Sequence, residues 1–189
     1  MKNYVIIPGS GATPFDNWYR WAQKELEEKG FNVCIPYLGQ GEFQNYKTWA
    51  KLIGAYVKAG IIGKNTTIIA HDVACVFITR FLIENKVSVD GVIAVSPFNT
   101  ILGMEDDKLN KSFITKNDKL AKIDRFVKFY HAFISDNDPV VSEDIFEKFC
   151  ELTGAKKHIV VGAGHFAENI SSKGFKDLID LVDNINKII

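Results

Sequence analysis

The chain lacks any imbalance of charge and any long apolar run. Its 189 residues include 23 basic and 23 acidic side chains, so the formal net charge is zero. A neutral chain has no global electrostatic attraction to nucleic acid or to anionic lipid. No stretch approaches the roughly 20 consecutive apolar residues that cross a bilayer. We therefore expect neither nucleic acid nor a membrane as a partner, and the oligomeric state stays open.

One local excess of positive charge runs from residue 116 to residue 128. Its basic residues recur every three positions, at Lys116, Lys119, Lys122, Arg125 and Lys128. Such runs are usually solvated. We interpret this one as the exposed face of a helix.

Cysteine is also scarce, with Cys34, Cys75 and Cys150 in the whole chain. An odd number with neither a C-x-x-C pair nor the spacing of metal ligands argues against a disulfide framework and a metal site. We expect no metal and no organic cofactor. The first apolar run, residues 5–7, is shorter than the core of a secretion signal, which predicts a reducing, cytoplasmic location.

Short runs rich in valine, isoleucine and phenylalanine alternate with helical stretches along the chain. This alternation predicts one domain over residues 1–189, a three-layer α/β/α sandwich around a mostly parallel sheet of about six strands. The expected strands are Tyr4–Ile7, Asn32–Ile35, Thr66–Ala70, Gly91–Val95, Phe129–Ile134 and His158–Val161. The expected helices are Trp18–Lys29, Tyr46–Ala59, Val73–Glu84, Ser142–Leu152 and Phe175–Ile188. Residues 99–120 interrupt the alternation and have room only for a loop or a short helix, a minimal lid.

Three fragments place polar residues directly after apolar runs. They are Ala70-His71-Asp72-Val73-Ala74, Asp138-Pro139 and Gly164-His165. Open α/β sheets bind ligands at the carboxyl ends of their strands. The order nucleophile, acid, histidine is that of the α/β-hydrolases. A solitary D-P turn or loop histidine is weak evidence, but the ordered combination predicts Asp72, Asp138 and His165 as the catalytic residues.

Asp72 stands where a serine is usual. The sharp strand-to-helix turn that exposes such a nucleophile needs small residues two positions before and after it, and Ala70 and Ala74 meet that need. Aspartate also tolerates a positive φ better than most residues. In the alternative interpretation, Asp72 only caps the helix that begins at Val73.

Further motifs extend this pattern over most of the chain. They are Pro8-Gly9-Ser10-Gly11, Asn17-Trp18-Tyr19-Arg20-Trp21, Arg80-Phe81-Leu82, Ser135 to Val141 and Gly164-His165-Phe166. With them the chain resembles the small single-domain serine-hydrolase family of the α/β-hydrolase fold that includes retinoblastoma-binding protein 9 and the Bacillus protein YdeN. The resemblance implies a Ser-His-Asp triad on a six-stranded sheet, which falls here on position 72, His165 and Asp138. No L-x-C-x-E motif is present, so binding to retinoblastoma-type partners does not transfer.

The chain departs from this family at the first and third strands. Serine is replaced by Asp72, the small residue after the turn is Ala74, and a His-Gly pair after the first strand is Pro8-Gly9. The resemblance also implies an oxyanion hole. Its candidates are the loop of Gly9, Ser10 and Gly11 and the backbone N–H of Val73.

Three interpretations of Asp72 remain open. It is a nucleophile toward an alkyl carbon, as a resemblance to haloalkane dehalogenases and epoxide hydrolases implies, or it belongs to a binding protein that has lost catalysis. Alternatively it is a replacement that disables a serine enzyme. We expect a hydrolase of a small ester-like or alkyl substrate, in which two nearby carboxylates keep His165 protonated. Of the other possible nucleophiles, Cys75 should point into the core and Ser96 should line the pocket wall.

Overall fold

Six parallel strands form one sheet in the order β2-β1-β3-β4-β5-β6. The computed structural model describes residues 2–167 and 175–187. The strands are β1 (Asn3–Ile7), β2 (Asn32–Cys34), β3 (Thr66–His71), β4 (Gly91–Val95), β5 (Phe129–Ser135) and β6 (Lys156–Val160). The chain moves outward from β1 to β2 and then returns to place β3 on the other side of β1. A reversal of this kind opens a crevice at the carboxyl ends of the two strands.

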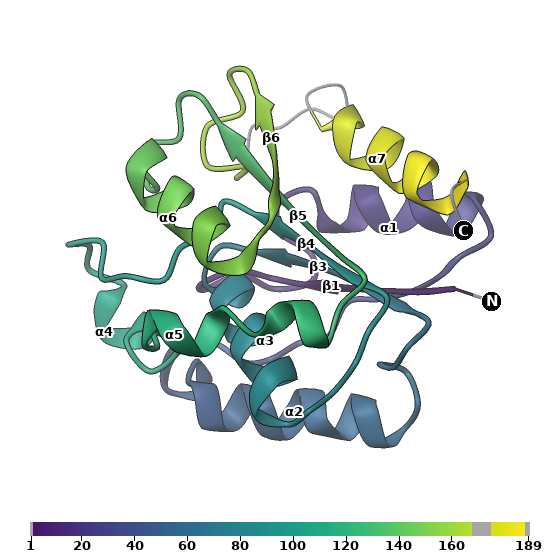
Figure 1. Ribbon diagram of the computed structural model, residues 1–189, viewed down its shortest axis with the longest axis horizontal. Helices are drawn as coiled ribbons and strands as arrows, with labels where there is room; N and C mark the ends of the chain where they lie inside the picture. Colours follow the sequence, from purple (N-terminus) through teal and green to yellow (C-terminus); the bar gives the residue numbers. More distant parts are fainter. Residues whose placement is uncertain (1, 168–174, 188–189) are drawn as a thin grey trace.

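Helices cover both faces of the sheet (Figure 1). One face carries α1 (Tyr19–Glu28) and α7 (Lys176–Lys187), and the other carries α2 (Tyr46–Lys58), α3 (Val73–Glu84) and α6 (Glu143–Thr153). Each face has its own cluster of buried apolar side chains. Successive residues of a strand point to opposite faces, so Val5 and Ile7 join one cluster while Tyr4 and Ile6 join the other. The three-layer α/β/α sandwich expected from the sequence is therefore confirmed.

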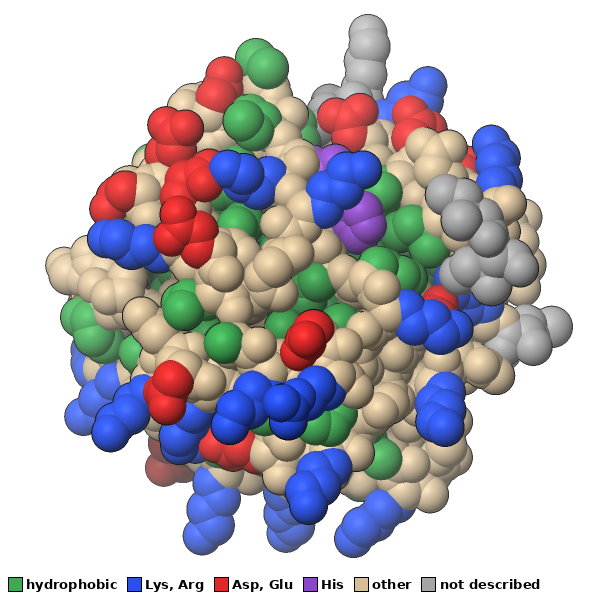
Figure 2. Space-filling model, viewed as in Figure 1, with side chains coloured by type: hydrophobic (Ala, Val, Ile, Leu, Met, Phe, Trp, Pro, Cys, Tyr) green, Lys and Arg blue, Asp and Glu red, His purple; other side chains and the backbone are tan. Residues whose placement is uncertain are grey.

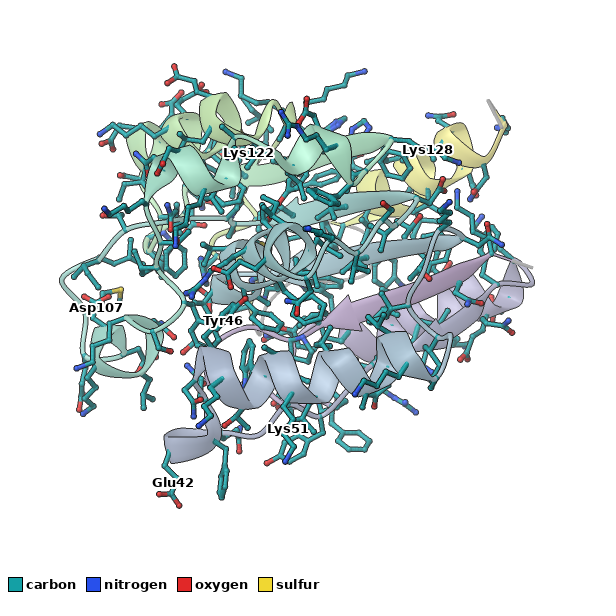
Figure 3. The ribbon with its side chains drawn as sticks, turned by 60° about the horizontal axis from the view of Figure 1, so that its bottom comes forward. Glu42, Tyr46, Lys51, Asp107, Lys122 and Lys128 are labelled. Atoms are coloured by element: carbon teal, nitrogen blue, oxygen red, sulfur yellow. The ribbon has the colours of Figure 1, made fainter. Side chains whose placement is uncertain are left out.

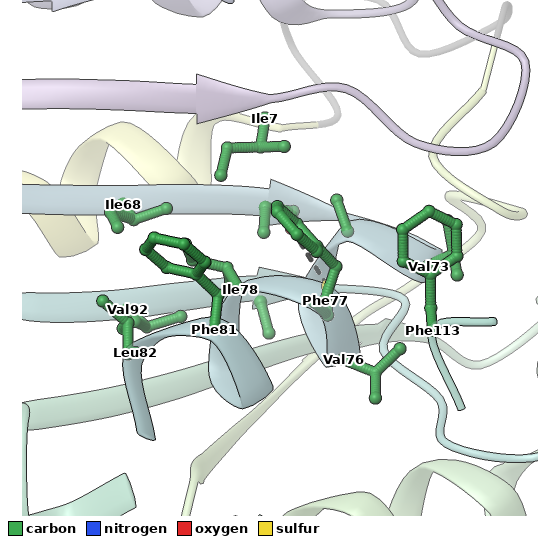
Figure 4. Packing of buried hydrophobic residues seen from close by; sticks show 14 of the residues in the cluster. Ile7, Ile68, Val73, Val76, Phe77, Ile78, Phe81, Leu82, Val92 and Phe113 are labelled. Atoms are coloured by element: carbon green, nitrogen blue, oxygen red, sulfur yellow. Dashed lines mark hydrogen bonds between the residues drawn. The ribbon is translucent and has the colours of Figure 1, made fainter. Parts of the chain in front are cut away.

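Helix α3 is buried along almost its whole length, from Val73 to Leu82. Its sequence is apolar on every side, which is typical of a helix enclosed by other elements. Phe77 and Phe81 pack over Ile68 of β3 and its neighbours (Figure 4). This packing makes the β3–α3 junction a rigid platform, and Asp72 lies on it.

Several expected boundaries move. Strand β2 ends at Cys34 rather than at Ile35, because the proline that follows has no N–H to donate. Strand β6 begins two residues before His158 and ends at Val160. It is an edge strand that starts with two exposed lysines, and charged residues at an edge discourage further strand pairing. A search for apolar runs misses these two residues, so the expected strand started too late.

Smaller changes affect the other elements. Strands β3 and β5 each run one residue further than expected, and β1 starts one residue earlier. Helix α3 has the expected bounds, whereas α1, α2 and α6 differ by one residue at one or both ends. Helix α7 runs over Lys176–Lys187, and the expected end at Ile188 lies outside the described residues.

The lid segment contains two short helices, α4 (Asp107–Asn110) and α5 (Asn117–Leu120). Figure 3 shows Asp107 beyond the carboxyl ends of the strands, on the side where the β1 arrow points. The basic side chains of residues 116–128 are exposed as expected, but the single helix expected there is wrong. Helix α5 is followed by the short 3-10 helix η2 (Ile123–Arg125), because the buried Leu120 and Ile123 anchor the chain at two points.

Although the whole chain is neutral, its acidic and basic side chains gather on different parts of the surface. Acidic side chains gather over α6 and basic side chains over α2 and α5 on the face drawn in Figure 2.

The remaining short element is the 3-10 helix η1 (Gly41–Phe43), directly before α2. Within residues 2–167 and 175–187, no helix is both long enough and apolar enough to cross a bilayer.

Candidate active site

Asp72 occupies the tight turn between β3 and α3. Its backbone is left-handed, with φ 56° and ψ −132°, and the residue is only 7 % exposed. Its N–H donates to the carbonyl of Val95 at the end of β4, and its own carbonyl accepts from the N–H of Cys75. The carboxylate makes no capping hydrogen bond to α3, so the helix-cap interpretation does not describe this side chain. Cys75 is buried, in keeping with a packing residue.

The loop after β1 lies directly against the carboxylate of Asp72. The backbone N–H of Ser10 donates to Oδ2 of Asp72 at 2.7 Å. Gly9 allows this approach, since a Cβ on it would lie 2.8 Å from the Cβ of Asp72. A Cβ contact this short requires the surroundings to shift, so glycine is the residue that fits here without strain. The N–H group expected to stabilise an oxyanion therefore already holds one carboxylate oxygen.

Asp138 lies behind His165 and is held from several directions. Nδ1 of His165 is 3.0 Å from Oδ2 and 3.1 Å from Oδ1 of Asp138. Oδ2 also accepts from the hydroxyl of Ser96 at 2.8 Å, and Oδ1 accepts from the N–H groups of Val140 and Val141. A carboxylate with this many donors has one orientation. Ser96, expected as part of the pocket wall, contacts the acid itself.

Asp72 approaches the opposite nitrogen of the same imidazole. Nε2 of His165 and Oδ1 of Asp72 are 3.7 Å apart, an ion pair that is too long for a hydrogen bond. The structure therefore brings all three sequence-predicted residues together around one ring. Asp138 contacts that ring directly, and Asp72 faces it across a short gap.

These contacts set the charges of the three groups. Burial disfavours the cation of His165, but its hydrogen bond to Asp138 and the two carboxylates outweigh burial and raise its pKa to about 9. Burial would raise the pKa of Asp72 and of Asp138, yet the interaction with His165 lowers both. The resting site is thus an imidazolium between two carboxylates.

Gln44, which the sequence analysis did not single out, connects the β1 loop to the lid. Its Oε1 accepts from the N–H of Gly11 at 2.8 Å, and its Nε2 donates to the hydroxyl of Ser10 and to Oδ1 of Asn110, each at 2.8 Å. Gly11 therefore presents its N–H to Gln44 and not to the site. Val73 opens α3, where the first N–H groups have no partner within a helix. No local motif marks Gln44, because its partners lie in distant segments.

A cavity of about 1210 Å³ lies over these residues. Asp72 and His165 line it together with Gly9, Ser10 and Gly11, whereas Asp138 does not reach it. The lid contributes Leu102 and Met104 and the acidic residues Glu105, Asp106 and Asp107. Trp18 and Tyr19 are buried at the start of α1, in accord with a packing role, and Tyr19 also reaches the cavity wall.

The comparisons with known proteins agree on the family. A family model described as serine hydrolase matches residues 4–183. The protein named "Putative hydrolase YdeN" from Bacillus subtilis (strain 168) is 26% identical over 182 residues, which cover 94% of this chain and 90% of that protein.

Solved structures show the same fold. The crystal structure of the ydeN gene product from B. subtilis superposes with a TM-score of 0.84 at 22% identity, over 97% of this chain and 98% of that one. Est1E from Butyrivibrio proteoclasticus, solved with bound ferulic acid, has a TM-score of 0.75 at 13% identity, over 97% and 89% of the two chains. The chain therefore belongs to the serine hydrolase family, is similar to YdeN and has the α/β-hydrolase fold.

Proposed function

We propose that the protein is a hydrolase in which Asp72 attacks an alkyl carbon that carries a leaving group, with His165 and Asp138 completing the triad. The observation that carries this proposal is the division of labour between the two oxygens of Asp72. Oδ2 is held by the N–H of Ser10, and Oδ1 faces the imidazole of His165 across 3.7 Å. Oδ2 is thereby held at the loop after β1, while Oδ1 is directed at the imidazole of His165.

The first step forms an ester on Asp72. Its Oδ1 attacks a saturated carbon, the bond to the leaving group breaks, and that group departs with the electron pair. Esterification removes one of the two negative charges beside His165. The pKa of His165 then falls, and the ring releases its proton to accompany the leaving group.

The second step hydrolyses this ester. Neutral His165, oriented by Asp138, accepts a proton from water, and the oxygen of that water attacks Cγ of Asp72. Negative charge develops on Oδ2, which the N–H of Ser10 already contacts. Collapse breaks the bond between Cγ and the alkyl-bearing Oδ1, and His165 gives its proton to that oxygen to form the alcohol. The second proton of the water then passes from the Asp72 carboxyl group to His165, which regenerates the carboxylate and the imidazolium.

Acyl transfer from an ester is less favourable at this site. Attack by a carboxylate on an ester carbonyl would give a mixed anhydride, which is far more reactive than an acyl-serine ester. The N–H of Ser10 also already contacts Asp72, so a substrate oxyanion would have to displace a charge-assisted hydrogen bond. Alkyl substrates avoid both difficulties.

A second candidate function is ligand binding without turnover. The observation that favours it is the acidic lid, where Glu105, Asp106 and Asp107 line the cavity. These side chains repel a departing anion, so His165 has to supply the positive charge that stabilises it. In a binding protein, the ion pair of Asp72 and His165 would remain intact.

The test traps the ester. In His165→Gln the second step has no base, so a panel of haloalkanes and epoxides should leave a mass adduct that maps to Asp72. In wild-type protein turned over in ¹⁸O water, one oxygen of the Asp72 carboxylate should become labelled. Asp72→Asn should do neither, and Asp118→Asn, at an exposed position on α5, should behave as wild type.

The two candidate functions give different results in this experiment. Absence of adduct, label and turnover over the whole panel, including chromogenic esters, would reject the enzyme. If panel compounds then shift the NMR signals of cavity residues without any reaction, ligand binding is supported instead.

A further inference from the structure

His71 is buried beside the proposed triad and takes no part in the steps above. It is the last residue of β3, directly before Asp72, and it is 3 % exposed. Its ring lies 5.3 Å from the ring of His165, centroid to centroid.

Both nitrogens of His71 have partners, and these partners assign its tautomer. Nε2 lies 2.9 Å from the backbone carbonyl oxygen of His165, which can only accept, so Nε2 carries a hydrogen. Nδ1 lies 2.8 Å from the hydroxyl of Tyr19. Burial raises the pKa of that hydroxyl, so Tyr19 stays protonated and its O–H donates a hydrogen bond to Nδ1.

The hydroxyl of Tyr19 also continues the chain toward the β1 loop. Its oxygen accepts from the N–H of Gly9 at 3.0 Å and from Nδ2 of Asn17 at 3.1 Å. Hydrogen bonds therefore run without interruption from Gly9 through Tyr19 and His71 to the carbonyl of His165. Gly9 is the residue that permits the close approach of Asp72, so this chain joins the two sides of the site.

The charge state of His71 is compatible with this chain of hydrogen bonds. Burial disfavours its cation and the positive charge of His165 opposes a second one, so its pKa is lowered to about 4. The pKa values of the two neighbouring histidines are thus shifted in opposite directions, and between about pH 4 and pH 9 His71 is neutral while His165 is charged. A neutral ring keeps Nδ1 as an acceptor for Tyr19.

The loop that carries His165 depends on contacts of this kind. Gly162, Gly164 and Phe166 all have positive φ, and for Phe166 such a backbone is strained. The N–H groups of Gly162, Ala163 and Gly164 donate to side chains at the end of β5 and in the β5–α6 connection. The contact from His71 holds the other side of the loop.

We propose that His71 is a positioning residue, whose Nε2–H holds the carbonyl of His165 while Tyr19 fixes its tautomer and couples it to the Gly9 loop. The consequence for turnover rests on the proposed function. The position and charge of His165 can be measured without a substrate, so this inference stands or falls independently of that function.

The first test needs no variant. Long-range ¹H–¹⁵N spectra of the wild-type protein at pH 7 distinguish the two tautomers and the cation for each of the four histidines. We expect His71 to be neutral with its hydrogen on Nε2. A hydrogen on Nδ1, or a cationic His71, would overturn the proposal.

The second test measures the pKa of His165 in variants. In His71→Leu the loop loses its donor and His165 moves away from its carboxylates, so its pKa should fall by about one unit or more, toward the ordinary value near 6.5. His71→Gln retains an N–H donor and should keep a pKa closer to that of wild type. Tyr19→Phe should allow the Nδ1 tautomer and give an intermediate fall.

The matched control is His131→Leu, which removes a buried histidine from β5, away from the cavity. It should reduce stability without changing the pKa of His165. A folded His71→Leu protein with the wild-type pKa at His165 would contradict a positioning role. Where His71→Leu does not fold, the tautomer measurement and Tyr19→Phe decide the question.

Discussion

Nε2 of His165 and Oδ1 of Asp72 face each other across 3.7 Å, with opposite charges and no hydrogen bond between them. Asp138 contacts the other nitrogen of the same ring at 3.0 Å. The imidazole therefore has a tight partner and a looser one. Removing the looser partner should leave the ring in place and change mainly its protonation.

The first prediction concerns the charge of His165. Asp72→Asn removes one of the two carboxylates that raise the pKa of His165 to about 9, so the pKa should fall toward the ordinary value of about 6.5. It should remain above that value, because Asp138 still contacts the ring. An NMR titration of the imidazole measures this, with Asp118→Asn as the control. A neutral His165 at pH 7 in the wild-type protein would contradict the geometry.

The second prediction is a gain of serine-hydrolase chemistry. In Asp72→Ser the N–H of Ser10 is released to serve an oxyanion, and His165 faces one carboxylate fewer, so it can act as a base. We expect hydrolysis of chromogenic esters and labelling by a fluorophosphonate probe. Asp72→Ala is the control and should show neither. A folded Ser variant that stays unlabelled would mean that the oxyanion loop cannot serve an acyl substrate.

The third prediction tests the close approach of the β1 loop. Gly9→Ala would place its Cβ 2.8 Å from the Cβ of Asp72, so backbone or side chain must shift. Overpacking of this kind costs roughly 1–3 kcal/mol. Urea unfolding should show the loss of stability, and the pKa of His165 should fall as Asp72 is displaced.

Gly54→Ala in α2 is the control for this substitution, since no atom lies within 4 Å of the new Cβ. It should be neutral or stabilising, because alanine is favoured over glycine inside a helix. Equal stability of the Gly9 and Gly54 variants would show that the loop after β1 accommodates a Cβ at residue 9 without strain.

The fourth prediction is a loss of stability in mild acid. Burial and the neighbouring His158 lower the pKa of His131 to about 4 in the folded protein, against about 6.5 when unfolded. The unfolded chain therefore binds more protons between these values. This contribution to stability is complete above pH 6.5 and is lost progressively as the pH falls toward 4.

Urea unfolding at pH 7 and pH 5 measures this effect. His131→Gln should reduce the difference between the two pH values by about 1 kcal/mol, because glutamine does not titrate. His71 contributes in the same direction, so some loss should persist in the variant. An identical pH dependence in the variant and the wild type would contradict the assignment to His131.

Much of the architecture was predictable because its signals are local. Six apolar runs separated by helical stretches require a parallel sheet with two covered faces, and α3 has the bounds that its apolar sequence predicts. The predictions were wrong where apolar content is a poor guide. Strand β6 opens with two exposed lysines, and residues 116–128 contain the short helices α5 and η2, anchored by Leu120 and Ile123.

The candidate site divides in the same way. Strand ends and residue types indicated Asp72, Asp138 and His165, and the fold brings them to one imidazole. Neither Gln44 nor the connection from Tyr19 to His71 could be read from a motif. Tyr19 and His71 lie 52 residues apart in the chain, and Gln44 and its partner Asn110 lie 66 residues apart.

By itself the sequence determined which segments become strands and helices, their order, and which chemical groups end up at the strand ends. Local backbone preference and the burial of apolar runs suffice for that. Only the tertiary structure decided which donor faces which acceptor: that Ser10 holds Asp72, that Gln44 takes the N–H of Gly11, and that His71 holds the His165 loop. Hydrogen bonds act over about 3 Å. Such distances between remote segments exist only after the layers have packed.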